Sequence, residues 1–528
     1  MSGLAGRWRT LWLVLAGTAI LLLAIRADGF PTVFTDTDDY YSQGVELWQK
    51  ARVEFLGVKP EPDTRSAADK RQAAIDAELS RTQMAARSTT YSLFLYGLES
   101  AGTLWLVAAA QAASAAWTLL LVLRCAVRRA GPRSYLAMMA LLAAGSTLPF
   151  FAGFAMPDAF AGVGVLGVAL LALYWPALSR TERAGVAVLL SFALVTHTSH
   201  ELLAITLVPV AAVLLWWMRA GWRSSAVRLA AVTATILVAI AINSGYGMIV
   251  EAQTGQRLRH QPFLMARTLA DGPGRAYLRH ACSHGEHYAL CRFQHLPLDD
   301  SEDILWSDLP TSGVFLIANY ATRVQLEIEE PRFIVQTIAF DPWAQIEASA
   351  ANWAKQLTLI GIDDVVRNPH YYMTDDYWAR TYLPDMIMAV AHCGRRGDAC
   401  ALWLTPAPTG DEGGLNGRSP PAPRPALFHG VVVLLSLALT AAALWPLRSR
   451  AATPAGRLLL AFAVLILAAV FLNAGITGVL SGPFARYQAR LIWLIPALAG
   501  VALAARVDGQ QAFRQLDVSG RQRIEHAE

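Results

Sequence analysis

The sequence has few charged residues. Of its 528 residues, 16% are Asp, Glu, Lys or Arg and 55% are hydrophobic, and the mean hydropathy is +0.36. A soluble protein of this length carries about a quarter charged residues. The shortage of charge argues against an ordinary soluble protein. Because the apolar residues also gather in runs approaching the roughly 17–25 residues that cross a bilayer, the sequence predicts an all-α polytopic membrane protein.

The sequence also lacks a concentrated basic stripe with interleaved aromatic residues. Its net charge is only +4, and its Lys and Arg residues are spread over many short segments. Nucleic-acid-binding proteins carry such a stripe on one face. We therefore expect the lipid bilayer, and no nucleic acid, as a partner.

About ten apolar segments are candidate membrane spans. The 35-residue stretch 184–218 contains the polar hexad THTSHE at 196–201, and one helix of that length would measure about 52 Å, nearly twice the hydrocarbon thickness. We therefore expect two short spans that meet at the hexad. The predicted spans are 11–25, 103–123, 135–152, 160–175, two within 184–218, 229–250, 427–447, 458–480 and 491–505.

The start of the chain is open to two interpretations. Arg7 and Arg9 precede the first apolar run, as they would in a signal peptide, but no small-x-small cleavage motif precedes Asp28. An uncleaved first span is the interpretation we favour, and in both cases the following segment is exported.

The arginines in short loops fall mainly on one side of the predicted membrane. The short turns on the other side hold only Arg486 and Arg490. By the positive-inside rule, we expect cytoplasmic termini and two periplasmic segments in a bacterial inner membrane. The predicted regions are a transmembrane region at 1–250 with a first periplasmic loop at 27–90, a mainly helical periplasmic domain at 251–426, C-terminal spans at 427–507 and a cytoplasmic tail at 508–528.

Cysteine is scarce, and four of the five cysteines lie in the predicted periplasmic domain. Nearby pairs in an oxidising compartment favour disulfides between Cys282 and Cys291 and between Cys393 and Cys400. A metal site is the alternative, because His280, His284 and His287 surround the first pair. Cys125, at a cytoplasmic helix end, is expected to be an inert buried thiol.

Polar residues interrupt the apolar runs on the predicted outer face. Charged groups near a bilayer cost a few kcal/mol each and usually mark function or pairing. Taken singly, these residues could cap helices, form a solvated turn or extend to the membrane surface; together they suggest a water-accessible cavity. They are Asp36, Asp38, Asp39, Asp158, His197, His200, Glu201, Arg486 and Arg490.

Three motifs occur in an order typical of one superfamily. TDTDDYY (35–41) follows the first span, RSTTYSLFLYG (87–97) leads into the second, and MPDAFAG (156–162) opens the fourth. Over about residues 1–220 the chain thereby resembles the GT-C superfamily of polytopic glycosyltransferases, which take a sugar from a polyprenyl-phosphate carrier. The segments FLMARTLADGPGRAYLRHAC (263–282) and EDILWSDLP (302–310) are similar to a bacterial membrane-protein family without an assigned activity.

The resemblance implies a GT-C-like fold and roles for the polar residues. Asp36 would be the base that accepts the proton of the acceptor hydroxyl, with Asp38 or Asp39 as second candidates. Arg87, Arg486 and Arg490 would contact the departing lipid phosphate, since arginine suits bidentate phosphate contact. The remaining substrate-binding candidates are Tyr91, Asp158, His197, His200 and Glu201.

A metal ion is a further possibility. Paired carboxylates suit hard cations, so Asp36 and Asp38 could hold a divalent Mg or Mn ion, and some members of the superfamily use a metal whereas others do not. The implied partner is a polyprenyl-phosphate-linked sugar. Two other classes compete with a transferase: a transporter, which the absence of an internal repeat disfavours, and a non-catalytic envelope binding or assembly protein.

Overall fold

The computed structural model describes residues 4–28, 31, 35–57, 87–101, 104–127, 130–254, 258–307, 309–362, 426–445 and 453–508. Within these ranges the regular structure is helical, without a β-strand. Seven helices are long and apolar enough to cross a membrane: 8–26, 104–126, 198–217, 222–252, 427–444, 454–480 and 485–508. The protein is therefore an α-helical polytopic membrane protein, as predicted.

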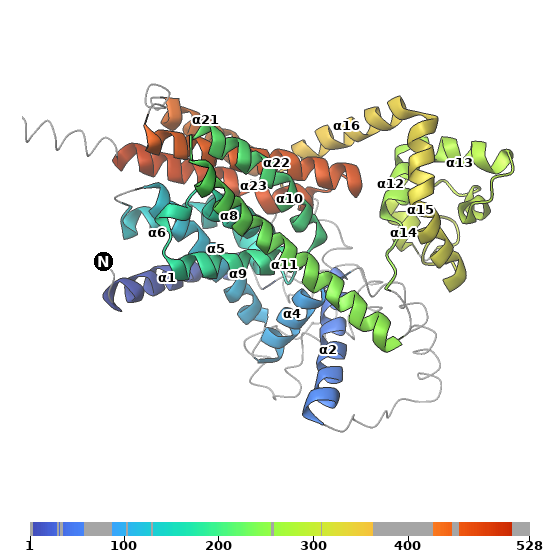
Figure 1. Ribbon diagram of the computed structural model, residues 1–528, viewed down its shortest axis with the longest axis horizontal. Coiled ribbons are helices and arrows are strands. Elements are labelled where there is room, and N and C mark those ends of the chain that lie inside the picture. Colours follow the sequence, from blue (N-terminus) through green and yellow to red (C-terminus); the bar gives the residue numbers. More distant parts are fainter. Residues whose placement is uncertain are drawn as a thin grey trace, which may run out of the picture.

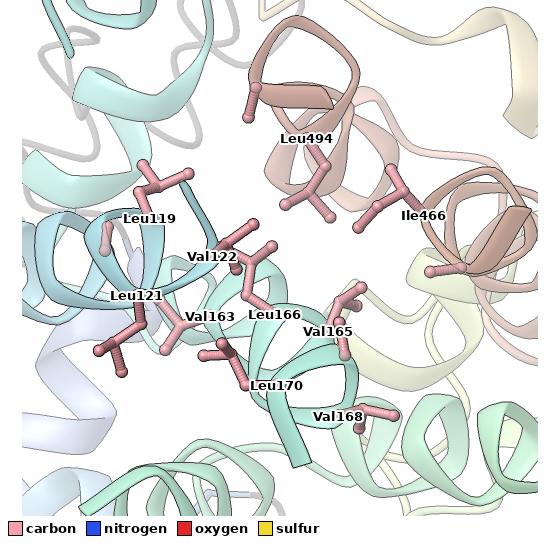
Figure 2. Packing of buried hydrophobic residues seen from close by; sticks show 14 of the residues in the cluster. Leu119, Leu121, Val122, Val163, Val165, Leu166, Val168, Leu170, Ile466 and Leu494 are labelled. Atoms are coloured by element: carbon pink, nitrogen blue, oxygen red, sulfur yellow. The ribbon is translucent and has the colours of Figure 1, made fainter. Parts of the chain in front are cut away.

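A short buried helix forms the centre of the bundle. All 14 residues of α8 (Ala159–Ala172) are buried, as expected of a helix that is apolar on every side. Figure 2 shows Val163, Leu166 and neighbouring side chains of α8 between α5 (Leu104–Ala126) and the C-terminal helices. At 14 residues, α8 is shorter than the other candidate spans.

The segment predicted as a third span is two helices rather than one. α6 (Pro132–Gly145) ends where Ser146 adopts an extended backbone, and α7 (Leu148–Gly153) begins two residues later. Between the two helices, the Thr147 hydroxyl donates a hydrogen bond to the carbonyl of Ala489 at 2.6 Å. Side chains with hydroxyl groups compete with helical hydrogen bonds in this way, and the break brings the chain back toward the site described below.

The polar hexad at 196–201 separates two helices, as predicted, but only the second of them is among the seven candidate spans. α9 (Arg180–Val195) ends at Thr196, and α10 (Thr198–Trp217) begins after His197, which is its N-cap. The next helix, α11 (Trp222–Thr254), has 33 residues. At 1.5 Å per residue it is about 50 Å long, so it extends roughly 20 Å beyond a hydrocarbon core of about 30 Å.

Beyond α11 the chain forms a small helical domain, which we call the loop domain (residues 258–362). Figure 1 places it at one end of the bundle. Its helices are α12 (Phe263–Asp271), α13 (Pro273–Ser283), α14 (Ser301–Trp306), α15 (Tyr320–Phe340) and α16 (Pro342–Thr358). Met265, Tyr277, Leu305 and Phe333 belong to its own hydrophobic core.

The loop domain contains one of the two predicted disulfides. Cys282 and Cys291 are bonded, as predicted, and this pairing removes both thiolates from the alternative metal site. Cys393 and Cys400 lie outside the described residues, so their pairing stays a prediction. Cys125 is a free thiol at the end of α5.

The last helix of the loop domain packs along a membrane helix. α16 lies against α22 (Pro454–Leu480), where the backbone of Asn352 approaches Gly478. Gln356 donates to the carbonyl of Phe484 at 2.9 Å and accepts from its N–H at 3.0 Å. Phe484 is the N-cap of α23 (Ala485–Ile492), so the loop domain fixes the start of the helix that carries Arg486 and Arg490.

Helices from both ends of the sequence pack around the centre of the bundle. α1 (Leu4–Asp28) packs on α5, while α2 (Thr35–Leu56) packs on α4 (Thr89–Ala101). α21 (Ala426–Leu444) lies beside α22 and α23 in Figure 1. Thr37 in the first turn of α2 donates to the carbonyl of Ala155 at 3.1 Å, which joins α2 to the turn before α8.

Candidate functional site

Charged side chains from four separate segments meet in one place. They come from the first turn of α2, the segment just before α4, the turn before α8 and the first turns of α23. We call this group the polar cluster and define it as Asp36, Asp39, Arg87, Asp158, Arg486 and Arg490. Its members are joined by a continuous set of ion pairs.

The more accessible part of the cluster is built around Asp36. One carboxylate oxygen accepts from Arg87 Nη2 at 2.8 Å and the other from Arg486 Nη1 at 3.1 Å. Arg87 also donates to Asp39 through Nε at 3.1 Å and Nη2 at 2.9 Å. The side chains of Asp36, Arg87 and Asp39 are 23%, 21% and 57% exposed, so a solute can reach this part.

The two carboxyl groups in α2 respond differently to their surroundings. Burial opposes ionisation of Asp36, but Arg87 and Arg486 together outweigh it and hold the pKa of Asp36 below its usual range. For Asp39, partial loss of water around the carboxylate and the nearby Asp36 carboxylate prevail over Arg87 and raise the pKa. Asp36 is therefore ionised at neutral pH and held between two guanidinium groups.

The inner part of the cluster is closed. Arg490 Nη1 donates to Asp158 at 3.0 Å, and the two side chains are 1% and 3% exposed. Arg490 Nη2 donates to Ser199 at 2.9 Å and to Asn473 at 3.3 Å. Arg486 Nε lies 3.9 Å from Asp158 and so connects the inner part to Asp36.

Three titratable residues of the hexad at 196–201 have different surroundings. His197 reaches the cluster indirectly, because its Nδ1 lies 2.8 Å from Ser199 Oγ, which accepts from Arg490. His200 is buried, with Nδ1 2.9 Å from the carbonyl of Ala193, and it lines a small apolar cavity between α8 and α10. Glu201 accepts from Asn243 of α11 at 2.6 Å. Only His197 of the three is linked to the charged groups by these bonds.

An aromatic layer supports the cluster. Tyr40 lies 5.6 Å from the Arg87 guanidinium and packs edge-on against Tyr91. Tyr91 is fully buried and donates to Gln111 at 3.1 Å, and Gln111 in turn donates to the carbonyls of Ala152 and Phe154. Tyr91 therefore helps to hold α4 against α5 and, through Gln111, against the end of α7, and its predicted role in substrate binding stays a prediction.

The described residues give no support to a metal ion at this site. Within the described ranges, no group of three His, Cys, Asp or Glu side chains could hold one. Both oxygens of Asp36 are occupied by arginines, and the side chain of Asp38 lies outside what the structure describes. A divalent cation at Asp36 and Asp38 stays a prediction.

Several residues of the site were not among the site residues predicted from the sequence. Asn473 and Gln111 are single polar residues with partners 17 and 43 positions away, whereas Ser199 binds Arg490, which is 291 positions away. Trp306 of α14 lies 6.0 Å from the Arg87 guanidinium, so the loop domain also reaches the cluster. Pairing across more than two hundred positions can be found only from the folded chain.

The polar cluster is balanced in charge, with three carboxylates and three guanidinium groups. Such an arrangement can bind a phosphate at its arginines if a carboxylate releases them, and can accept a proton at a carboxylate. Comparison with family models, with curated proteins and with solved structures gives no match to this chain.

Proposed function

We propose that this protein is an integral membrane glycosyltransferase that moves a sugar from a polyprenyl-phosphate donor to an acceptor hydroxyl. The observation that supports it best is the meeting of Asp36 with Arg87 and Arg486. These residues are the predicted base and two predicted phosphate ligands, and they come from three segments that share no local sequence pattern.

The two parts of the cluster have different roles in this proposal. Arg87 and Arg486 contact the donor phosphate, since a guanidinium group forms bidentate, charge-assisted hydrogen bonds with phosphate oxygens. Stabilising the charge of the leaving phosphate is a large part of the catalysis that such a reaction needs. Asp158 and Arg490 are too buried to meet a substrate, and they fix the position of Arg486.

The membrane arrangement belongs to the same proposal. The loop domain and the polar cluster lie on the periplasmic side of a bacterial inner membrane, with both termini in the cytoplasm. The donor enters from the outer leaflet with its lipid chain in the bilayer and its sugar at the membrane surface. The acceptor is a hydroxyl of a cell-envelope glycan or glycolipid.

The test uses the full chain in lipid nanodiscs. Undecaprenyl phosphate carrying glucose, mannose or arabinose is supplied in turn, and release of undecaprenyl phosphate to water or to a sugar acceptor is measured by mass spectrometry. Asp36→Asn should lower the release rate by about 10²–10⁴-fold if Asp36 takes part in proton transfer or in ordering the arginines.

The matched control is Glu46→Gln. Glu46 lies on the same helix, but it pairs only with Lys50 at an exposed position, so this variant should keep the wild-type rate. A wild-type protein that binds all three donors without cleaving any of them would contradict the transferase and favour a binding protein.

A further inference from the structure

The loop domain brings a third acidic segment to the polar cluster. α14 is anchored on one side by Arg267, whose Nη1 lies 3.4 Å from Ser301 and 3.5 Å from the carbonyl of Ser481. On its other side, Trp306 lies beside Arg87. α14 therefore lies between the connection that precedes α23 and the segment that carries Arg87.

Glu302 lies between these two anchors. Ser301 is buried, and Asp300 caps the helix by accepting from the N–H of Glu302 at 2.8 Å, so the backbone at this position is fixed. The Glu302 side chain is exposed. It precedes Trp306 by four residues on α14, so the two side chains lie on the same face of the helix, and Trp306 lies 6.0 Å from the Arg87 guanidinium. Among the described residues of α14, Glu302 is the carboxyl residue that shares the face of Trp306.

We propose that Glu302 is the base that accepts the proton of the acceptor hydroxyl, and that Asp36 instead holds Arg87 and Arg486 in place. This assignment rests on the proposed transferase. Asp36 is bound by two arginines through both oxygens, which makes its carboxylate a poor proton acceptor. Glu302 has no such ion pair among the described contacts.

The reaction balances with Glu302 in this role. The acceptor oxygen attacks the anomeric carbon and forms the new C–O bond, while its proton passes to the Glu302 carboxylate. The bond between the anomeric carbon and the phosphate oxygen breaks, and the lipid phosphate leaves with the electron pair as a dianion at Arg87 and Arg486. The proton of Glu302 then passes to water.

The acid–base properties of Glu302 fit a base that works near neutral pH. Partial loss of water around the carboxylate raises the pKa of Glu302 to about 7, the Asp36 and Asp300 carboxylates add to this effect, and Arg486 and Arg87 oppose it. Efficient bases have a pKa near the working pH. Because only the ionised form accepts a proton, the rate should rise with pH up to about 7 and then level off.

The experiment compares pH profiles of the nanodisc-embedded full chain with the three undecaprenyl-phosphate sugars as probes. Glu302→Gln should lower kcat by about 10²–10⁴-fold, leave KM for the donor within about threefold, and remove the rise in rate below pH 7. The control is Asp303→Asn, a neighbouring exposed carboxyl on the same helix, which should keep the wild-type profile.

A second measurement does not depend on activity. Carbodiimide modifies protonated carboxyl groups, so the pH at which labelling of Glu302 falls by half, read by mass spectrometry, should lie near 7. A wild-type rate and pH profile in Glu302→Gln, or half-labelling near the ordinary glutamate value, would overturn the role of Glu302 and leave the transferase standing. A wild-type protein that cleaves none of the probes would overturn the transferase itself, and the base assignment with it.

Discussion

At the residue scale, the buried pair of Asp158 and Arg490 offers the sharpest test of how the cluster is held. Asp158→Ala leaves the Arg490 guanidinium without its carboxylate in a closed site, and breaking a buried pair in this way costs about 3–5 kcal/mol. We expect this loss in the free energy of unfolding, measured by titration with denaturing detergent in mixed micelles.

Two control variants show whether the loss of stability comes from leaving a charge buried. Glu46→Ala removes an exposed ion pair with Lys50 and should change the unfolding free energy by less than about 0.5 kcal/mol. Adding Arg490→Met to Asp158→Ala should recover part of the loss, because no charge is then left buried. If Asp158→Ala unfolds like the wild type, the pair does not support the fold.

Some residues of the polar cluster could be predicted from the sequence, whereas their pairing could not. A carboxylate or an arginine beside an apolar run is conspicuous, so Asp36, Asp158, Arg486 and Arg490 could be selected by position. Their partners could not, because the Asp36 and Arg486 pair spans 450 positions. Glu302 was not selected as a site residue, because its segment 302–310 lies far from any predicted span and drew attention only through its similarity to a family without an assigned activity.

At the element scale, close contact between α2 and α4 depends on one glycine. A Cβ atom at Gly44 would lie 2.4 Å from the backbone oxygen of Ser92, so Gly44→Ala must push the helices apart. Such overpacking costs about 1–3 kcal/mol, and it would also move Asp36 and Asp39 away from Arg87. We expect lower thermal stability together with a lower rate of lipid phosphate release.

For Gly97, which lies on α4, we expect a gain in stability instead of a loss. A Cβ atom there has open space around it, so Gly97→Ala should gain helix stability of up to about 1 kcal/mol without changing the rate. Thermal unfolding followed by intrinsic fluorescence reports both variants. Equal effects of the two substitutions would show that the contact at Ser92 does not govern the packing of α2 on α4.

Helix positions were predictable in most places, and the exceptions have a physical cause. Hydropathy located α1, α5, α10, α11, α21 and α22, because an apolar run that crosses a bilayer must satisfy its backbone internally as a helix. The break between α6 and α7 was missed, since Ser146 and Thr147 interrupt the helix through hydrogen bonds to other backbone groups that hydropathy does not register.

At the scale of the whole molecule, the loop domain is joined to the membrane helices near the site. Gln356 fixes Phe484 two residues before Arg486, and Trp306 lies beside Arg87. The sequence indicated a separate hydrophilic domain of helices, but composition does not show where such a domain docks. The docking makes the loop domain part of the site rather than an appendage.

The side of the membrane that holds the loop domain can be tested on the whole molecule. In a Cys125→Ser background, one added cysteine at exposed Ala350 of α16 and another at exposed Ser224 near the start of α11 report opposite faces. A membrane-impermeant maleimide should label A350C in intact spheroplasts, and should label S224C only after the membrane is permeabilised. The parent protein without either cysteine sets the background. Labelling in the reverse pattern would place the polar cluster on the cytoplasmic side of the membrane. The donor would then have to bind from the inner leaflet, and the assignment of a periplasmic acceptor would fail.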